Sequence, residues 1–257
     1  MSSMRLPSYY IVLLFLGAAA CTDTAAPTTA APAARAAPVP GIVLLADSRA
    51  PTGDSLAFPK IFGAAFRKGT RARQGAASYA FVVRELGKLA SLSGKLVAGD
   101  PVVLADQPAF AQVFPMGRFP VQLALAKTTD DERVAFARVV FSAARVAKWE
   151  FALLPGQKPL ALKDSAFYCY GVDAGMGAFI DSVANRQLAA KGQATWEQAF
   201  LQKAEQSGYQ GYVYEFDSYN LATFLTGYGD GCYATYLGRD AHGQVCQLLT
   251  DFGLVAW

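Results

Sequence analysis

Residues 227–253 read GYGDGCYATYLGRDAHGQVCQLLTDFG. A Gly-Asp-Gly turn leads into a β-prone run, Cys232–Leu237, and the polar turn Asp240–Gly243 reverses the chain into a second run, Val245–Thr250. Two β-prone runs joined by a short turn that contains Gly and Asp are the strongest local signal for a β-hairpin. The stretch therefore predicts a hairpin that completes an antiparallel sheet.

Further β-prone runs lie upstream of this hairpin. Val121–Lys127 and Val134–Ser142 are separated by a polar turn, and a short link precedes Val146–Leu154. Apolar and polar residues alternate in the last run, which is typical of a half-buried strand. We expect these three runs to form an antiparallel meander. The earlier segment Tyr79–Leu92 is predicted as a strand followed by a short helix.

Two helices are predicted between the meander and the C-terminal strands. Asp181 or Ser182 can cap the first helix, which ends at Gly192. Thr195 with Gln198 three residues later forms a capping box for the second helix. Strands followed by a helical pair and more strands, without regular βαβ alternation, indicate an α+β fold with a mainly antiparallel sheet.

The N-terminal residues have the composition of a secretory signal, with Arg5, a short apolar run and small residues before Cys21. The apolar run is shorter than the roughly twenty residues that cross a bilayer. A cysteine directly after small residues resembles the lipobox of bacterial lipoproteins, in which the thiol is acylated and the chain is cut before it. We therefore predict a signal peptide over 1–20 and lipid attachment at Cys21, with a simple secretion signal as the alternative. The residue after the cysteine is Thr22 and not Asp, which resembles the lipoproteins that are sorted to the outer membrane.

Residues 21–40 are mainly Ala, Pro and Thr, a composition that predicts an extended tether. Residues 41–257 are numerous enough for a single globular domain with one substantial core. The sequence thus predicts an exported protein that is attached to a membrane through its N-terminal lipid, facing the periplasm. An envelope protein or a cell-wall ligand is the expected partner.

Basic and acidic residues nearly balance, at 23 and 20, which argues against a nucleic-acid partner and against a polybasic membrane-binding surface for the protein as a whole. The charge is nevertheless uneven along the chain. Lys60–Lys95 carries eight basic residues and one acidic residue, Glu85, whereas Glu205–Trp257 carries six acidic residues and one basic residue. The two segments can neutralise each other across the fold, or the first can form a separate basic docking site. The sequence leaves both interpretations open.

Three cysteines follow the predicted tether, in an export context that permits disulfides: Cys169, Cys232 and Cys246. If Arg239 pairs with Gln244 in the hairpin, Cys232 and Cys246 lie farther apart than the Cα limit of about 7 Å for a disulfide. A bond between these two is therefore disfavoured. A bond from Cys169 to either of them, or three buried thiols, remain as alternatives.

The sequence offers few residues for nucleophilic or metal-dependent catalysis. His242 is the single histidine and lies in the predicted hairpin turn, although a Ser-His-Asp or Cys-His arrangement would need it. No Cys-x-x-Cys pair and no Gly-x-x-x-x-Gly-Lys motif is present. Gly229–Ala234 fits a dinucleotide-binding pattern only formally, because it leads into a predicted strand and carries Asp230 where the phosphate would lie. We therefore expect neither a metal nor a cofactor, and the sequence favours a protein without catalytic activity.

The remaining candidates are carboxylates beside glycines and tyrosines at alternate positions. As binding residues we consider Asp173, Asp181, Asp217, Asp230, Tyr214 and Tyr233. Paired carboxylates can perform acid–base chemistry or hold a hard cation. Asp beside Gly is also typical of ordinary turns, and alternating aromatic residues are typical of a packed core.

Six stretches occur in a characteristic order: Gly94–Pro101, Pro115–Val121, Asp131–Ala135, Trp149–Leu153, Tyr170–Gly175 and Gly229–Gly253. This ordered set resembles the bacterial domain-of-unknown-function family 4241 and covers most of Leu89–Gly253. The resemblance implies a family and no particular activity. At one place the family pattern resembles Trp-x-Asn, whereas this chain has Ser218-Tyr219-Asn220. The resemblance therefore implies no role for an aromatic residue at position 218.

Three functions are compatible with these features. The leading hypothesis is a lipid-anchored envelope protein whose domain binds a partner or ligand without catalysis. One alternative is a carboxylate-dependent hydrolase of envelope polymers that uses Asp173, Asp181 or Asp230 as acid or base. The other is an immunity-like inhibitor of an exported toxin.

Overall fold

The computed structural model describes residues 33–34, 43–45, 59–74, 76–162, 166–206, 210–255 and 257. The chain divides into two units, Met1–Ala30 and Ala31–Trp257, and every described residue belongs to the second. The predicted signal peptide, Cys21 and most of the predicted tether lie outside the described residues. In the described ranges, no helix is both long and apolar enough to span a membrane.

The second unit consists mainly of antiparallel strands, which confirms the predicted α+β class. Its elements are β1 (Ala33–Ala34), β2 (Val43–Leu45), α1 (Lys60–Ala64), β3 (Arg71–Gln74), β4 (Ala77–Ser91), β5 (Leu96–Gly99), the 3₁₀ helix η1 (Pro101–Asp106), β6 (Gly117–Lys127), β7 (Glu132–Val140), β8 (Lys148–Phe151), β9 (Ala166–Phe167), β10 (Tyr170–Val172), β11 (Met176–Asp181), α2 (Ser182–Ala190), α3 (Gln193–Gln206), β12 (Gly211–Phe216), β13 (Tyr219–Leu225), β14 (Gly231–Arg239) and β15 (Val245–Asp251).

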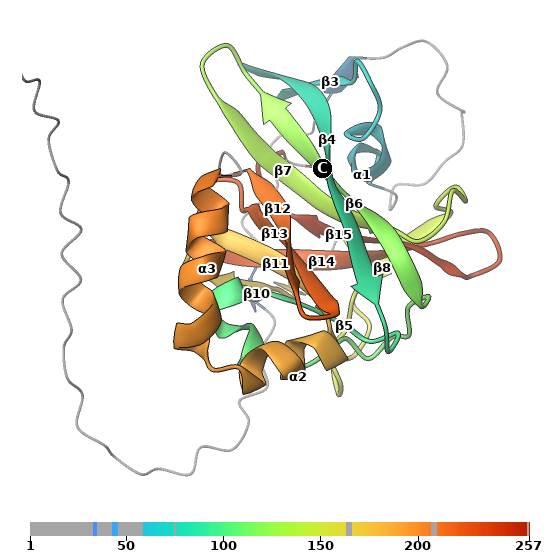
Figure 1. The fold of residues 1–257 in the computed structure, drawn as a ribbon. Coiled ribbons are helices and arrows are strands. Elements are labelled where there is room, and N and C mark those ends of the chain that lie inside the picture. The colour runs from blue at the N-terminus through green and yellow to red at the C-terminus, as the bar shows by residue number, and fades with distance from the viewer. Residues whose placement is uncertain are drawn as a thin grey trace, which may run out of the picture. The chain divides into compact units, whose positions relative to one another are not determined.

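Two sheets make up most of this unit. The large sheet has the strand order β10-β14-β15-β7-β6-β4-β3-β2, with β8 also paired to β14. The small sheet has the order β12-β13-β11-β5. Figure 1 shows the small sheet between the large sheet and helices α2 and α3. A separate short pair joins β1 to β9.

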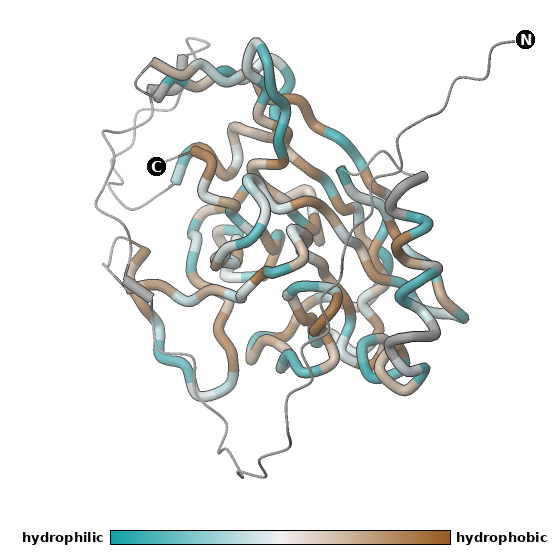
Figure 2. Tube along the Cα trace, turned by 90° about the vertical axis from the view of Figure 1, so that its left-hand side faces the viewer, coloured by the Kyte–Doolittle hydropathy of each residue, from teal (hydrophilic) through white to brown (hydrophobic). Residues whose placement is uncertain are grey.

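Three groups of buried apolar side chains hold these layers together. The first fills the space between the two sheets and includes Leu123 of β6 and Phe179 of β11. The second covers the other face of the large sheet, where Phe62 of α1 packs against Phe136. The third lies between the small sheet and the helices and includes Leu188 of α2. Figure 2 shows how hydrophobic and hydrophilic residues follow one another along the chain trace.

The predicted C-terminal hairpin is confirmed as β14 and β15, but its register differs from the prediction. Arg239 pairs with Val245 instead of Gln244, and a bulge beside Arg239 shifts the remaining pairs by one more residue. The physical reason lies in the turn. The Asp240 carboxylate accepts hydrogen bonds from the backbone N–H groups of His242 and Gln244, which stabilises a longer turn than the predicted one.

The predicted meander is correct for β6 and β7 and wrong for its third strand. β7 pairs with β15 on its second side, and β8 pairs with β14 instead. Trp149 and Phe151 of β8 explain this position, because their rings contact Phe62 and Tyr236 in the second apolar group. We therefore attribute the pairing of β8 with β14 to the contacts of its aromatic side chains. The position of β8 after β7 in the sequence does not determine its neighbour in the sheet.

Two further element predictions need correction. The segment predicted as a strand followed by a helix forms one fifteen-residue strand, β4, in which a bulge after Glu85 places Leu86 in the first apolar group. Helix α3 begins at Gln193, two residues before the predicted cap at Thr195. The predicted cap of α2 is confirmed, since the Asp181 carboxylate accepts a hydrogen bond from Val183 N.

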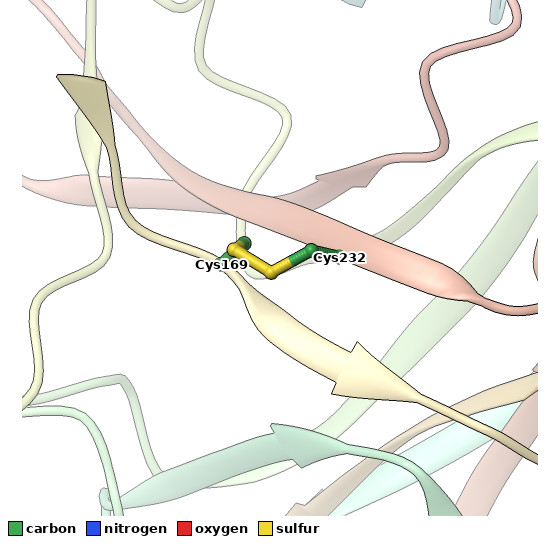
Figure 3. Close-up of a disulfide and its surroundings, with 2 residues drawn as sticks. All are labelled: Cys169 and Cys232. Carbon is green, nitrogen blue, oxygen red and sulfur yellow. A yellow bond between two sulfur atoms is a disulfide. The ribbon is translucent and has the colours of Figure 1, made fainter. Parts of the chain in front are cut away.

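A disulfide joins Cys169 to Cys232, as Figure 3 shows. It connects the segment before β10 with β14, and the two Cα atoms are 5.4 Å apart. Cys246 is a buried free thiol whose Sγ donates a hydrogen bond to the Gly238 carbonyl. The exclusion of a Cys232–Cys246 bond is thus correct, although the register on which it was based is not.

Candidate functional site

An open pocket of about 630 Å³ lies between η1, the loop that follows it and helix α2. This volume falls within the range of several hundred Å³ that is typical of small-molecule sites. We refer to it as the α2 pocket. It is lined by Lys95, Val97, Ala105, Gln107, Pro108, Ala109, Phe110, Ala111, Pro155, Ser182, Asn185 and Arg186.

The charged side chains of the α2 pocket are both cationic. Lys95 precedes β5, and its ammonium group donates hydrogen bonds to the carbonyl oxygens of Ala111 at 2.5 Å and Gln112 at 3.1 Å. Arg186 lies on α2 and is exposed. Among the described residues that line the pocket, none is acidic. The two charged side chains of the lining are thus both positive, in a pocket that is open to solvent.

The fully buried carboxylate of Asp181 joins the two elements that carry these cations. Besides capping α2, it accepts hydrogen bonds from the backbone N–H groups of Leu92 and Ser93 and from the Ser93 hydroxyl. The backbone N–H of Ser182 donates to the Lys95 carbonyl at 2.8 Å. The start of β5 and the start of α2 are thus held at a fixed separation.

The opposite wall is also held by internal hydrogen bonds. Asn185 is 6% exposed, and its side-chain amide donates to the Leu104 carbonyl of η1 at 2.8 Å. In the loop after η1, the backbone N–H of Phe110 donates to Leu96 at 2.9 Å, and that of Ala111 donates to Leu153 at 2.7 Å. The α2 pocket is therefore formed by the fold itself and does not depend on a ligand to create it.

Two of the predicted site residues, Asp173 and Asp230, lie in neighbouring exposed turns. One oxygen of the buried Asp100 carboxylate accepts hydrogen bonds from the backbone N–H groups of Asp173 and Ala174. The Asp230 carboxylate accepts a bond from Gly175 N at 3.1 Å. These contacts fasten the turn before β11 to the turn before β14. The carboxylates of Asp100 and Asp230 are the turn-stabilising groups in these contacts, and Asp173 contributes its backbone N–H.

Asp217 and Tyr214 lie elsewhere, on the hairpin formed by β12 and β13. Asp217 is the turn residue, with a φ of 47°, and its carboxylate forms an ion pair with Lys191 at 2.8 Å. The ring of Tyr214 stacks on Phe216 and contacts Phe200 edge-on. The structure thus places Tyr214 against the third apolar group.

Tyr233 is buried on β14, and its hydroxyl donates to the carbonyl oxygens of Gly229 at 2.6 Å and Thr226 at 3.1 Å. Burial raises the pKa of this phenol above its usual value. These hydrogen bonds attach the buried tyrosine to two carbonyl groups of the turn before β14 and so stabilise that turn. It is a structural hydrogen-bond donor in this position.

The predicted candidates therefore do not gather in one site, apart from the adjacent turns of Asp173 and Asp230. Asp181 is beside the α2 pocket, but its carboxylate faces the protein interior. Within the part of the chain that the structure describes, no three His, Cys, Asp or Glu side chains are placed to hold a metal ion. His242 is exposed in the hairpin turn.

A family model described as a protein of unknown function, DUF4241, matches residues 89–250. The chain belongs to the DUF4241 family. This confirms the resemblance inferred from the sequence. No curated protein and no solved structure matches the chain. All residues of the α2 pocket lie within the matched range, so the pocket is part of the DUF4241 domain.

Sequence reasoning missed the cationic residues of this DUF4241 domain. Lys95 falls in the first of the six family stretches, but nothing local distinguishes it from other lysines. Nothing in the sequence around Arg186 distinguishes it from any other arginine on the surface of a helix. The two come together because β5 pairs with β11, which leads into α2, and because the Asp181 hydrogen bonds fasten the same junction. These contacts connect residues about eighty to ninety positions apart.

Proposed function

We propose that the DUF4241 domain binds a small anionic ligand in the α2 pocket and does not catalyse a reaction. The observation that carries this proposal is the charge of the lining, which contains Lys95 and Arg186 and no described acidic residue. Charge–charge attraction is stronger in a partly enclosed site than in open water, because the effective dielectric constant is lower. An anion is therefore the best complement to the pocket.

The rest of the lining favours a ligand that also has an apolar part. Proline, alanine, valine and phenylalanine residues make up most of the lining, and Gln107 and Ser182 contribute polar groups. A mixed lining of this kind binds through apolar contact and orients the ligand through a few polar groups. Cell-wall peptides that end in a free carboxylate have both properties. We propose this class as the ligand.

The positions of the carboxylates support binding over hydrolysis. The oxygens of Asp181 already accept hydrogen bonds from four donors, so this group has no vacant lone pair directed at the pocket. Asp173 and Asp230 belong to turns and do not line the pocket. A general base must lie within hydrogen-bonding reach of the proton that it removes. None of the three meets this condition for a ligand in the α2 pocket.

The binding proposal is tested with the unacylated chain, residues 21–257 carrying Cys21→Ser. Isothermal titration calorimetry compares cell-wall peptides that end in a carboxylate with the same peptides as C-terminal amides. Arg186→Gln removes one charge-assisted contact, so we expect affinity for the carboxylate form to fall about tenfold or more.

Arg145→Gln is the matched control, because Arg145 is exposed and does not line the pocket. It should leave the affinity unchanged. Equal binding of the carboxylate and the amide, or equal loss in the two variants, would contradict the proposal.

We also propose that the protein is exported and anchored by a lipid on Cys21. The signal-like N-terminus and the lipobox resemblance support this location, and so does the Cys169–Cys232 disulfide, because disulfides persist mainly in oxidising compartments. Radiolabelled palmitate should enter the wild-type protein in cells and not the Cys21→Ser variant. Equal labelling of both, or none in the wild type, would reject lipid attachment at this residue.

A further inference from the structure

The large sheet extends beyond the small sheet at one end (Figure 1), and there the side chains of β3 and β4 are exposed on the face that elsewhere meets the small sheet. On β6 this face is still buried at Leu123 and Leu125, which pair with Arg84 and Val82, so the exposed part consists of β3, β4 and the end of β6. The cover ends near Leu86 of β4, where Gly211 at the start of β12 approaches so closely that an added Cβ would lie 3.1 Å from Leu86 Cδ1. Alternate residues of a strand share a face, so Arg84, Val82 and Ser78 continue this face beyond the cover. Arg84 and Ser78 are exposed, and Val82 is 45% exposed.

Strand pairing adds three more basic side chains to this uncovered face. Arg73 lies opposite Ser78, and the cross-strand row Arg71–Ala80–Lys127 runs through β3, β4 and β6. Directly paired residues project from the same side of a sheet, and neighbouring strands are about 4.8 Å apart. Both arginines are exposed, and the Lys127 side chain is 57% exposed. We call Arg71, Arg73, Arg84 and Lys127, with Val82 among them, the basic face.

The basic face keeps most of its charge. Lys127 has one carboxylate nearby, Glu132 at 4.0 Å, which also accepts a hydrogen bond from the Gln210 amide. The ion pairs found among the described residues include none that involves Arg71, Arg73 or Arg84. The sequence left two interpretations of the basic segment Lys60–Lys95: neutralisation by the acidic C-terminal segment, or a separate docking site. The described ion pairs do not support neutralisation at these three arginines. Within the described part of the chain, these three side chains therefore have no ionic partner that competes with an external anion.

We propose that the basic face binds the surface of an anionic lipid bilayer. Its cations are spread over three strands of a rigid sheet, an arrangement that complements many headgroups in a plane better than one small ligand. Guanidinium groups bind phosphate in a two-pronged geometry, and the exposed Val82 supplies an apolar contact between them. Because charge nearly balances over the whole chain, the attraction to an anionic bilayer comes from this face and not from the net charge of the protein.

This surface is separate from the α2 pocket, so the two proposals can fail independently. The unacylated chain is titrated with vesicles of 30% phosphatidylglycerol and 70% phosphatidylcholine, and with vesicles of phosphatidylcholine alone. We expect binding to the anionic vesicles only, and its loss in 0.5 M salt, since screening removes the attraction. Each basic residue near such a surface contributes about fivefold in affinity. Arg71→Gln with Arg73→Gln should therefore weaken binding roughly 25-fold.

The matched control is Arg145→Gln with Lys158→Gln, which removes the same charge from exposed positions outside the basic face. This double variant and the pocket variant Arg186→Gln should both bind the anionic vesicles like the wild type. A circular dichroism melt verifies that all variants are folded. Equal binding to both vesicle types, equal weakening in the two double variants, or binding to polyglutamate or an oligonucleotide in preference to the vesicles would overturn the proposal.

Discussion

At the scale of single residues, the buried carboxylates of this protein act as hydrogen-bond acceptors that fix turns and helix starts. Asp181 joins the end of β11, the turn before β5 and the start of α2. Asp100 performs the same task for η1 and the turn at Asp173. An aspartate beside a glycine in the sequence is equally compatible with this role and with catalysis, so the sequence alone does not distinguish them.

The structural role of Asp181 gives a direct prediction. Asp181→Asn replaces one acceptor oxygen by an amide that faces backbone donors, so the free energy of unfolding should fall by about 2–4 kcal/mol. Asp217→Asn is the control, because its ion pair with Lys191 is exposed to solvent and asparagine tolerates a positive φ. It should cost less than about 1 kcal/mol. Urea denaturation measures both variants, and similar losses would show that Asp181 does not hold the two elements together.

At the scale of elements, contacts between side chains that are distant in sequence determine which strands pair and where a strand continues, and local sequence patterns do not show this. Two β-prone runs joined by a short turn correctly predicted the hairpin of β14 and β15. Alternation of apolar and polar residues correctly predicted β8 as a strand, but the expectation that it continues the meander was wrong, because the ring contacts of Trp149 and Phe151 select its neighbour. The prediction of a helix at the end of β4 was also wrong, because the bulge at Leu86 interrupts the period of two. Such irregularities depend on partners far away in the sequence.

The turn that precedes the hairpin is the most constrained part of this element. Gly227 has a φ of 52°, and a Cβ there would lie 2.6 Å from Leu254 Cδ1 and 3.1 Å from the Phe252 carbonyl oxygen. Gly243 has a φ of 77° with no atom within 4 Å of an added Cβ. Alanine at either position incurs backbone strain of about 1–2 kcal/mol. Only Gly227→Ala must also displace a buried side chain.

We therefore expect Gly227→Ala to destabilise the protein by about 1–3 kcal/mol more than Gly243→Ala does. Thermal and urea unfolding of the two variants provide the comparison. Equal destabilisation would mean that the C-terminal residues do not pack against this turn as the structure shows.

At the scale of the whole molecule, the two proposed surfaces lie apart. In Figure 1, α2 is at the bottom of the second unit and β3 is at the top. A bilayer bound to the basic face would therefore leave the α2 pocket open. An anchored protein could then sample cell-wall fragments while its orientation at the membrane stays fixed.

The sequence predicted the α+β class and the family, because both depend on local periodicity and on ordered motifs along the chain. It did not predict the α2 pocket. Lys95 and Arg186 are distant in sequence, and their proximity follows from the pairing of β5 with β11 and from the hydrogen bonds at Asp181. The excess of basic residues before Lys95 was visible in composition, but only strand register shows that Arg71, Arg73 and Arg84 share one exposed face.

The central claim is that the α2 pocket binds an anionic cell-wall peptide. Nuclear magnetic resonance titration of the unacylated chain with a carboxylate-ended peptide tests it most directly. Amide shifts should concentrate at residues 95–97, 105–111 and 182–186, and they should be lost with Arg186→Gln or with the amidated peptide. Shifts that cluster around Asp173 and Asp230 instead, or identical titrations of wild type and Arg186→Gln, would contradict the claim.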